Sequence, residues 1–508
     1  MDTTTQVLIA GAGPVGMTLA LTLSRQGISV RIVDKSPSRT DKSKALVMWP
    51  RTLELFDIEG CVKSFLDAGM QGRRVRIVSD GKTLLHAEFD RAKSSFPYAL
   101  MIPQSETERV LEEQLASRGV HVERSTELQS FVDDGSAVMA KLLGQDGNVE
   151  ELRAAYLAGC DGAHSVVRKG IGAEFTGMAE PSGWILADLM LDGDVTHDEI
   201  VIIWTRHGVL AIFPIVGNRY RVIADVPADE GDVLAPLPLD RVQKVLDERG
   251  LGGLRAHDPF WLSRFRINER KVHDYTKGRC FLVGDAAHIH SPAGGQGMNT
   301  GMQDAFNLAW KLAMAVNGQA GSKLLATYSQ ERSAIGDQVL RNASVMTHVA
   351  TVGNPFLQKL RNVAVGALGD LSIVQQRLVD QLAELDLSYH HSDLGAPHNS
   401  VAHKLPKGNR VPDVAVISQG AATRLFAVLR SGRFVLLTVG AETAEVPVAL
   451  HEWVIAASAV PGGAFEEGLV YLIRPDSYLL GSATVAGALD LLGSLKPFTT
   501  SGSAGPAS

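Results

Sequence analysis

A glycine-rich turn near the N-terminus limits what this chain can fold into more than any other feature. In VLIAGAGPVGMTLALTLSRQGISVRIVDKS, residues 7–10 form a buried-strand run and residues 17–25 have helical periodicity. Gly27 ends the helix, and a second strand over residues 29–33 leads to Asp34. This order of strand, glycine turn, helix, strand and acid is the βαβ fingerprint of dinucleotide-binding folds. It predicts an α/β, Rossmann-like domain.

Each glycine of the GAGPVG motif has a predicted task. Gly11 permits the tight turn, Gly13 lets the backbone approach a pyrophosphate, and Gly16 lets the helix pack closely on the strand. The helix N-terminus offers free N–H groups to phosphates. Asp34 is placed to accept ribose hydroxyls, which disfavours a 2′-phosphate and hence NADP at this site. The motif alone does not distinguish NAD from FAD. The predicted contacts are Gly11, Gly13, Pro14, Val15, Gly16, Asp34 and Lys35.

Composition narrows the class of protein. A chain of 508 residues has room for about three domains. The formal net charge is -7 and no long Lys/Arg run occurs, so we expect neither nucleic acid nor a membrane surface as partner. The three cysteines, Cys61, Cys160 and Cys280, form no CxxC pair, which fits a reducing compartment and argues against a zinc site. No signal peptide or membrane-length apolar run is visible, so we predict a cytoplasmic protein.

Two further motifs accompany the first. LAGCDGAHSVVRKGIG spans residues 157–172, and GDAAHIHSPAGGQGMN spans residues 284–299. Together with GAGPVG, in this order and spacing, they resemble the class A FAD-dependent aromatic hydroxylases, the p-hydroxybenzoate hydroxylase-like monooxygenases. The resemblance covers residues 5–385 and includes IPQSETERVLEEQL at residues 102–115, which in that family lies on a helix beside the flavin.

The resemblance implies FAD as cofactor. Asp285 would bind the ribityl or ribose part, Pro292 would lie beside the isoalloxazine, and residues 294–299 would pass under the ring. A helix with a capping-box pair, Thr300 and Gln303, is expected to follow. Further flavin contacts implied by the resemblance are Lys44, Gln104, Asp161, Gly162, Asp285, Pro292, Gly297, Met298 and Asn299.

Two basic residues raise questions about phosphate binding. The family commonly has Arg where this chain has Lys44, and Lys keeps the charge but loses the bidentate fork. Arg51 stands nearby, and which of the two reaches phosphate stays open. The family has no separate NAD(P)H domain, so Arg168, beside the DG motif, is a candidate for the phosphates of the reductant. The alternative for Arg168 is a surface salt bridge.

The segment between the second and third motifs is rich in short strands. LADLML, IVIIWT, GVLAIFPI, RYRVIADV and FWLSRFRI predict an antiparallel sheet inserted into the nucleotide fold. In the family this sheet roofs the flavin and the substrate lies between them. Pro292, His288 and His290 are candidates for catalysis, the histidines either as a base that activates a phenol or as packing and hydrogen-bonding residues. Candidates for contact with an aromatic substrate are Trp204, His207, Phe213, Arg221 and Trp261.

The predicted domains follow from these segments. An FAD-binding domain comprises residues 1–174 and 271–385, and a substrate-binding β-sheet domain comprises residues 175–270. Residues 386–412 are a linker whose histidines lack the spacing of a metal site. Residues 413–496 resemble the thioredoxin-like tail of the phenol hydroxylase branch, through RPDSY at 474–478. No cysteine follows Cys280, which excludes a redox role for this domain and leaves a structural one, such as a homodimer contact. Residues 497–508 are expected to be disordered.

The function implied by the resemblance is FAD-dependent monooxygenation. NADH or NADPH would reduce FAD, O2 would add to give a flavin C4a-hydroperoxide, and an OH would pass to a phenolic or polycyclic aromatic substrate. A Baeyer–Villiger or dehalogenating monooxygenase shares every motif. A non-catalytic FAD-binding protein is the alternative from another class. A disulfide reductase is disfavoured because no CxxC occurs, and a flavin halogenase because no WxWxIP segment occurs.

Overall fold

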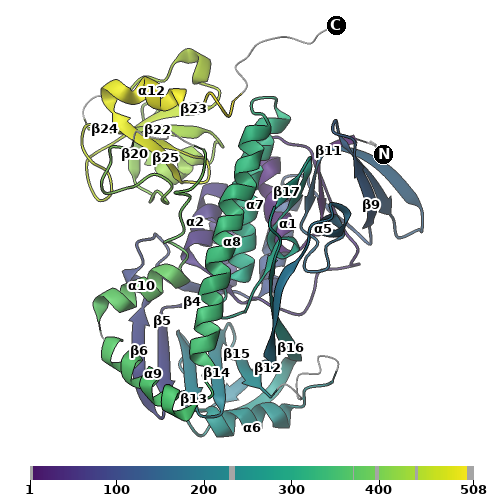
Figure 1. The fold of residues 1–508 in the computed structure, drawn as a ribbon, viewed down its shortest axis with the longest axis vertical. Helices are drawn as coiled ribbons and strands as arrows, with labels where there is room; N and C mark the ends of the chain where they lie inside the picture. The colour runs from purple at the N-terminus through teal and green to yellow at the C-terminus, as the bar shows by residue number, and fades with distance from the viewer. Residues whose placement is uncertain (1–3, 228–234, 370, 395–399, 441–443, 500–508) are drawn as a thin grey trace.

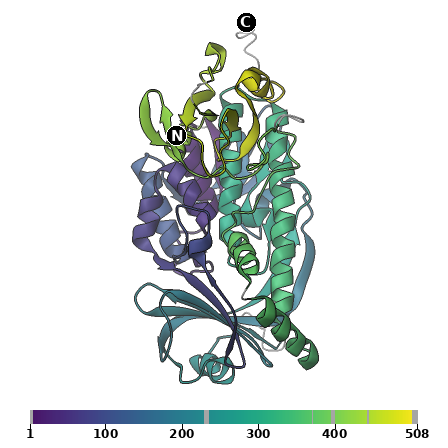
Figure 2. The same cartoon turned by 90° about the vertical axis from the view of Figure 1, so that its left-hand side faces the viewer.

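The computed structural model confirms an α/β architecture with an inserted antiparallel sheet (Figures 1 and 2). The elements line up along one long helix, α8 (Ser322–Ala350), with the inserted sheet at one end and the C-terminal domain at the other. The structure describes residues 4–227, 235–369, 371–394, 400–440 and 444–499.

The first sheet carries the glycine-rich motif. The second half of β1 (Thr4–Ala10) is apolar on both faces because this central strand belongs to a parallel sheet with both faces covered, and Val7, Leu8 and Ile9 are fully buried. Helix α1 (Pro14–Arg25) packs against α4 (Gln104–Ser117) and α7 (Gly297–Val316). The parallel strands, in spatial order, are β18 (Cys280–Leu282), β11 (Val149–Gly159), β1 (Thr4–Ala10), β2 (Val30–Asp34) and β8 (Val122–Arg124). The antiparallel additions are β17 (Thr276–Lys277), β10 (Val138–Leu143) and β9 (Glu127–Asp133).

The second sheet contains all five predicted strands and three strands from segments predicted to belong to the FAD-binding domain, β5, β6 and β19. β5 and β6 come from the segment predicted to belong to the FAD-binding domain, and β5 pairs in parallel with β13. This hairpin, predicted to belong to the FAD-binding domain, thus pairs with the second sheet, because only the tertiary fold decides which sheet a hairpin joins. The spatial order is β19 (His288–Ile289), β16 (Arg255–Lys271), β12 (Thr176–Asp192), β15 (Arg219–Val226), β14 (Gly208–Ile215), β13 (Glu199–Thr205), β5 (Arg74–Ser79) and β6 (Lys82–Glu88).

The register of the second sheet decides which side chains face the first domain. Arg221 on β15 pairs with Asp188 on β12 and with Phe213 on β14. Cross-strand partners share a face, so these three side chains lie side by side. The opposite face packs against α6 (Leu239–Arg249) in a core of its own.

The helix after the third motif begins earlier than predicted. α7 starts at Gly297 with Gln296 as its N-cap, so the capping-box expectation is wrong. The side chains of Thr300 and Gln303 instead donate to the buried carboxyl group of Glu384, at 3.1 and 2.5 Å. Glu384 follows α10 (Ser372–Leu382), and tertiary contacts thus use the side chains that could have capped the helix. The remaining connecting helices are α2 (Pro50–Glu59), α3 (Val62–Ala68), α5 (Val166–Gly170) and α9 (Pro355–Leu368).

The C-terminal domain is a mixed sheet with two short helices. Its loop at residues 474–478 docks on the first domain through buried charges: Arg474 pairs with Glu331 on α8, and Asp476 accepts from the Trp310 indole on α7. Its strands, in spatial order, are β21 (Ala421–Arg424), β20 (Ala415–Ser418), β23 (Val454–Ala459), β22 (Phe434–Val439), β24 (Leu469–Ile473) and β25 (Leu479–Thr484), and its helices are α11 (Leu425–Leu429) and α12 (Ala488–Gly493).

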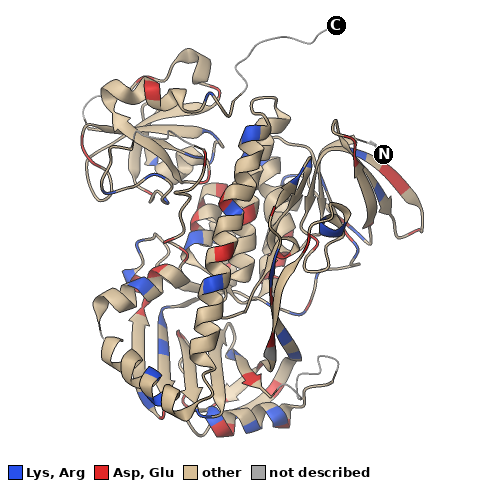
Figure 3. Ribbon diagram, in the orientation of Figure 1, with Lys and Arg blue, Asp and Glu red and all other residues tan. Residues whose placement is uncertain are grey.

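Charges of both signs are interspersed along the molecule, including along α8 (Figure 3). No helix in the described part of the chain is long and apolar enough to cross a membrane. Among the described residues, no group of three or more His, Cys, Asp or Glu could hold a metal ion. His398, in the predicted linker, and most of the tail predicted to be disordered, residues 500–508, lie outside the described residues.

Candidate functional site

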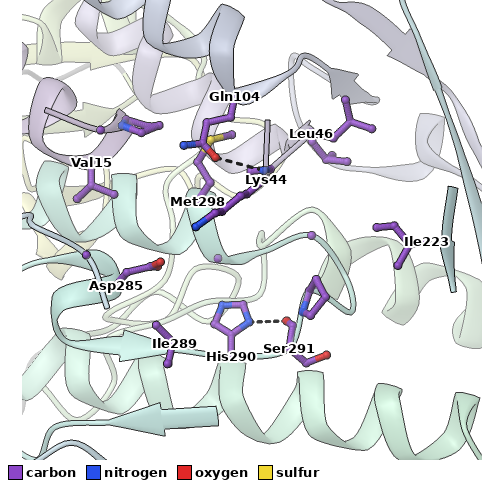
Figure 4. Close-up of a pocket in the computed structure, with 18 of the residues that line it drawn as sticks. Val15, Lys44, Leu46, Gln104, Ile223, Asp285, Ile289, His290, Ser291 and Met298 are labelled. Carbon is purple, nitrogen blue, oxygen red and sulfur yellow. Dashed lines mark hydrogen bonds between the residues drawn. The ribbon is translucent and has the colours of Figure 1, made fainter. Parts of the chain in front are cut away.

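A cavity of ≈ 370 Å³ lies where the two large sheets meet (Figure 4). Segments from all three sequence motifs line it, together with the Lys44–Val47 loop, Gln104 and the facing strands of the second sheet. The predicted residues that line it are Gly13, Pro14, Val15, Lys44, Gln104, Gly162, Phe213, Arg221, Asp285, His290, Pro292, Gly297 and Met298.

The glycine turn has the geometry that its sequence predicts. Gly11 has φ +100°, and a Cβ on it would lie 2.4 Å from the Cys160 carbonyl oxygen. A Cβ on Gly16 would lie 2.0 Å from the Gly11 carbonyl oxygen, so only glycine allows α1 to approach β1 this closely. Gly13 lines the cavity, and a Cβ there would meet no protein atom within 4 Å. Space beside Gly13 is thus left for a ligand.

The acid at the end of β2 holds the turn from outside the cavity. The Asp34 carboxylate accepts from the backbone N–H of Ala12 at 2.7 Å and of Ser36 at 2.8 Å. Lys35 is exposed, and neither residue lines the cavity.

The second motif is organised by Asp161. Its Oδ2 accepts from the N–H groups of Val166 and Val167, the first two of α5, at 2.6 and 3.3 Å, and so supports the helix start that Ser165 caps. Its Oδ1 is buried without a partner. Arg168 is buried rather than part of a surface salt bridge. Its guanidinium donates to the carbonyls of Ala286 and Ala163, at 3.1 and 2.7 Å, and so ties the second motif to the third.

A cation and an anion line the cavity near the glycine turn. The Asp285 side chain is open to the cavity, but the protein around the cavity desolvates its carboxyl and raises its pKa, and the positive charges of His288 and Lys44 oppose that shift. Gln104 holds the loop that carries Lys44, since its Oε1 accepts from the Ala45 N–H at 3.2 Å. Figure 4 shows Lys44 lying between Gln104 and Asp285. Arg51, the other basic residue considered, is fully buried on α2 and bonds the C-terminal domain instead.

The glycine loop before α7 is fixed by two side chains. Gly294 and Gly295 have φ +85° and +64°, values that favour glycine. The Trp49 indole donates to the Gly294 carbonyl at 2.9 Å. Asn299 donates to the carbonyls of Gly295 and Val47, at 3.1 and 2.8 Å, from outside the cavity lining. Gly297 and Met298, the first residues of α7, line the cavity, so the free N–H groups and positive dipole end of that helix lie at the cavity.

The two histidines of the third motif differ. His288 is buried, its Nε2 lies 2.7 Å from Asp304 Oδ2, and it does not line the cavity. His290 lines the cavity, and its Nδ1 lies 2.8 Å from the Ser291 carbonyl oxygen. Burial lowers the pKa of His290 to about 4, because an apolar setting disfavours the charged imidazole. His290 is thus neutral at physiological pH.

The substrate candidates separate into two groups. Phe213 and Arg221 line the cavity, whereas Trp204, His207 and Trp261 do not. Trp204 is buried beneath Arg361 of α9, and His207 lies in an exposed turn. The Arg221 guanidinium lies over the Trp261 ring, with its Cζ 5.9 Å from the ring centroid. Sequence reasoning missed the apolar lining residues Leu46, Val47, Ile223 and Ile289. No sequence signal singles them out, because apolar residues of strands and loops acquire a binding role only from the face that the fold gives them.

The arrangement fits FAD. Gly13 leaves room for phosphate beside the N-terminus of α1. Asp285 and Lys44 offer an acceptor and a cation in the middle of the cavity, and the loop around Gly295 and Gly297 offers backbone to a flat ring. The strands of the second sheet close the opposite side with Phe213 and Ile223, which suit an aromatic ligand.

Comparison with known proteins adds independent evidence. Residues 4–343 match the model of the FAD binding domain family, and residues 403–492 match that of the aromatic-ring hydroxylase C-terminal domain. An uncharacterized aromatic compound monooxygenase of Bacillus subtilis is 34% identical over 488 residues, which cover 93% of each chain. The solved structure of an anhydrotetracycline hydroxylase from Streptomyces rimosus superposes with a TM-score of 0.80 at 31% identity, covering 97% of this chain and 99% of that one. A dialkyldecalin synthase of Streptomyces rugosporus is 30% identical over 92% of this chain and 94% of its own length.

Proposed function

This chain belongs to the family of FAD-dependent aromatic-ring hydroxylases, and from that premise we propose that it hydroxylates a flat, phenolic polycyclic aromatic compound. FAD is the cofactor, NADH or NADPH the reductant and O2 the oxidant. We also propose a cytoplasmic location, which the three unpaired cysteines suit. We propose in addition a homodimer, in which the cysteine-free C-terminal domain would supply a structural contact.

One observation carries the proposal: the three cofactor motifs and the face of the second sheet line a single cavity. Gly13, Asp285 and Gly297 supply the cofactor side, and Phe213 and Ile223 supply the facing wall. A ring bound against Phe213 would lie next to whatever the glycine loop holds. This is the juxtaposition that transfer of oxygen from a flavin to an aromatic ring requires.

The chain's own groups would bind and orient rather than react. FAD, when bound, supplies the redox chemistry and the activation of oxygen. Lys44 and the α7 N-terminus would stabilise negative charge on the cofactor. The apolar walls would exclude water, which otherwise diverts activated oxygen to hydrogen peroxide. His290, being neutral, would offer a hydrogen-bonding ring without a competing charge.

A polycyclic substrate is favoured over a small phenol for two reasons. The facing wall carries the apolar side chains Phe213 and Ile223 on two neighbouring strands, and Leu46 adds a further apolar side chain to the lining. The Arg221 guanidinium, which could have paired with a phenolate or a carboxylate, is occupied by Asp188 and two backbone carbonyls. Binding would therefore rely on apolar contact with the rings more than on one ionic contact.

The test is NADH and NADPH oxidation by the FAD-loaded protein, with and without anhydrotetracycline, 1-naphthol and simple phenols. Strong stimulation by a polycyclic compound, with one labelled oxygen atom from O2 in a ring hydroxyl of the product, is the expected result. A labelled oxygen inserted between ring carbons would identify a Baeyer–Villiger enzyme, and halide release a dehalogenating one. Conversion of a substrate without NAD(P)H consumption would refute the hydroxylase and favour a synthase role.

A further inference from the structure

The C-terminal domain contributes no residue to the cavity, since no described residue beyond Met298 lines it. It also lacks cysteine, so its fold does not serve thiol chemistry. Its loop at residues 474–478 is nevertheless buried in the interface with the first domain. The partners of this loop in the first domain therefore indicate how the C-terminal domain could affect the reaction.

The loop bonds the first turn of α2 through Arg51. The guanidinium donates to the Asp476 carbonyl at 2.7 Å and to the Ser477 hydroxyl at 2.9 Å. It lies over the Tyr478 ring, with its Cζ 4.7 Å from the centroid. Arg51 is fully buried and also donates to Glu54, at 3.1 Å. The side chain therefore has its partners on the C-terminal loop and on its own helix.

Arg51 stands two residues after Trp49, the N-cap of α2. The Trp49 indole holds the Gly294 carbonyl, and the Trp49 N–H donates to Asn299 Oδ1 at 2.9 Å. Trp49, the N-cap of α2, thus holds the glycine loop that lines the cavity through hydrogen bonds to Gly294 and Asn299. A shift of the α2 N-terminus would move Trp49 and with it the loop around Gly295.

We propose that Arg51 is a positioning residue, through which the seated C-terminal domain sets the place of Trp49 and of the glycine loop that holds FAD. The inference rests on the proposed function only in assigning FAD to that loop. It gives the cysteine-free domain a part in catalysis although the domain is remote from the cavity.

The interface supplies a matched control at the other end of the same helix. Arg430 of the C-terminal domain donates to the carbonyls of Ile58 and Asp57, at 3.3 and 3.1 Å, where α2 ends. Arg430→Met would weaken the contact between the same two domains without removing any hydrogen bond at the α2 N-terminus. Arg51→Met would not orphan Glu54, because Arg410 donates to both oxygens of that carboxylate, at 2.9 and 3.0 Å.

The experiment compares the full-length wild type with Arg51→Met, Arg51→Lys, Ser477→Ala and Arg430→Met. FAD affinity is titrated on the apoprotein by quenching of flavin fluorescence, which needs no turnover. The yield of hydroxylated product per NAD(P)H is measured at saturating FAD with the substrate identified for the wild type. Thermal unfolding shows that each variant is folded at the assay temperature.

We expect Arg51→Met to weaken FAD binding about tenfold and to lower the product yield per NAD(P)H, since charge-assisted hydrogen bonds are lost. Ser477→Ala, which removes one acceptor, should weaken FAD binding about threefold. Arg51→Lys should lie between wild type and Arg51→Met, and Arg430→Met should match the wild type. Equal effects of Arg51→Met and Arg430→Met would overturn the inference in favour of general domain docking. Wild-type affinity and yield in Arg51→Met would also overturn it. A wild type that binds FAD but hydroxylates nothing would refute the proposed function, and the affinity titration would still decide the role of Arg51.

Discussion

The Arg221 guanidinium donates to both carboxylate oxygens of Asp188, each at 2.7 Å, across neighbouring strands of the second sheet. Its remaining N–H groups donate to the backbone carbonyls of Ser43 and Lys44 in the loop beside the cavity. Arg221 is a predicted substrate contact that lines the cavity, and its hydrogen bonds tie the loop at Ser43 and Lys44 to the second sheet. A buried ion pair of this kind is costly to break, because the remaining charge is left without a partner.

Arg221→Met should therefore lower the free energy of unfolding by about 3–5 kcal/mol, since Asp188 would stay buried and unpaired. Urea denaturation measures this change. Arg109→Met is the control: its pair with Glu113 is partly exposed on α4, and surface pairs contribute about 1 kcal/mol or less. Equal destabilisation by the two substitutions would show that the Arg221 pair does not fasten the loop.

Gly13→Ala should abolish tight FAD binding while leaving the apoprotein as stable as wild type. The backbone at Gly13, with φ -76° and ψ -177°, accepts alanine, and the new methyl would meet only the space left for phosphate. Gly321→Ala is the matched control, because Gly321 also caps a helix with an extended backbone, φ -101° and ψ -172°, and has no neighbour within 4 Å. Flavin titration and thermal unfolding together make the test. Unchanged flavin affinity in Gly13→Ala would move the phosphate site elsewhere.

Asp285→Ala should weaken FAD binding strongly, because a charge-assisted hydrogen bond to a cofactor hydroxyl contributes about 1.5–3 kcal/mol. That range corresponds to a loss of affinity of about tenfold or more. Isothermal titration of the apoprotein gives the value. Asp274→Ala, at a largely exposed carboxylate outside the cavity, is the control. A fully yellow Asp285→Ala protein with wild-type affinity would contradict the placement of FAD at this motif.

Glu384→Gln should change how stability depends on pH. Burial raises the pKa of the Glu384 carboxyl from 4.5 to about 8 in the folded protein. Between these values the folded state binds more protons than the unfolded state, so the contribution of Glu384 to stability falls as pH rises. The wild type should lose stability relative to Glu384→Gln between pH 4.5 and about 8 and show a constant difference above that window. Unfolding midpoints of both proteins across this range check the sign, and a constant difference throughout would refute it.

The sequence was most informative where function depends on the local path of the backbone. The tasks predicted for Gly11 and Gly16 follow from the local backbone: Gly11 has a positive φ in the tight turn, and a Cβ on Gly16 would meet the Gly11 carbonyl oxygen of the same βαβ unit. Phe213 and Trp204 are both predicted candidates for substrate contact, but only Phe213 lines the cavity, whereas Trp204, on the neighbouring strand, lies under Arg361. Alternation along a strand gives the face of a residue and does not say what covers that face.

What the sequence by itself determined is the cofactor fold: strand, glycine turn, helix and acid lie within 30 residues, and their geometry is dictated by steric limits at each glycine. What only the tertiary structure decided is which distant groups meet. Arg51, a candidate for phosphate contact, donates to the C-terminal loop. Arg221 donates to a carbonyl of the Lys44 loop, and β5 and β6 pair with the second sheet. The physical reason is that a buried guanidinium or an unpaired strand edge must find partners wherever the packed chain provides them, and such partners lie hundreds of residues apart.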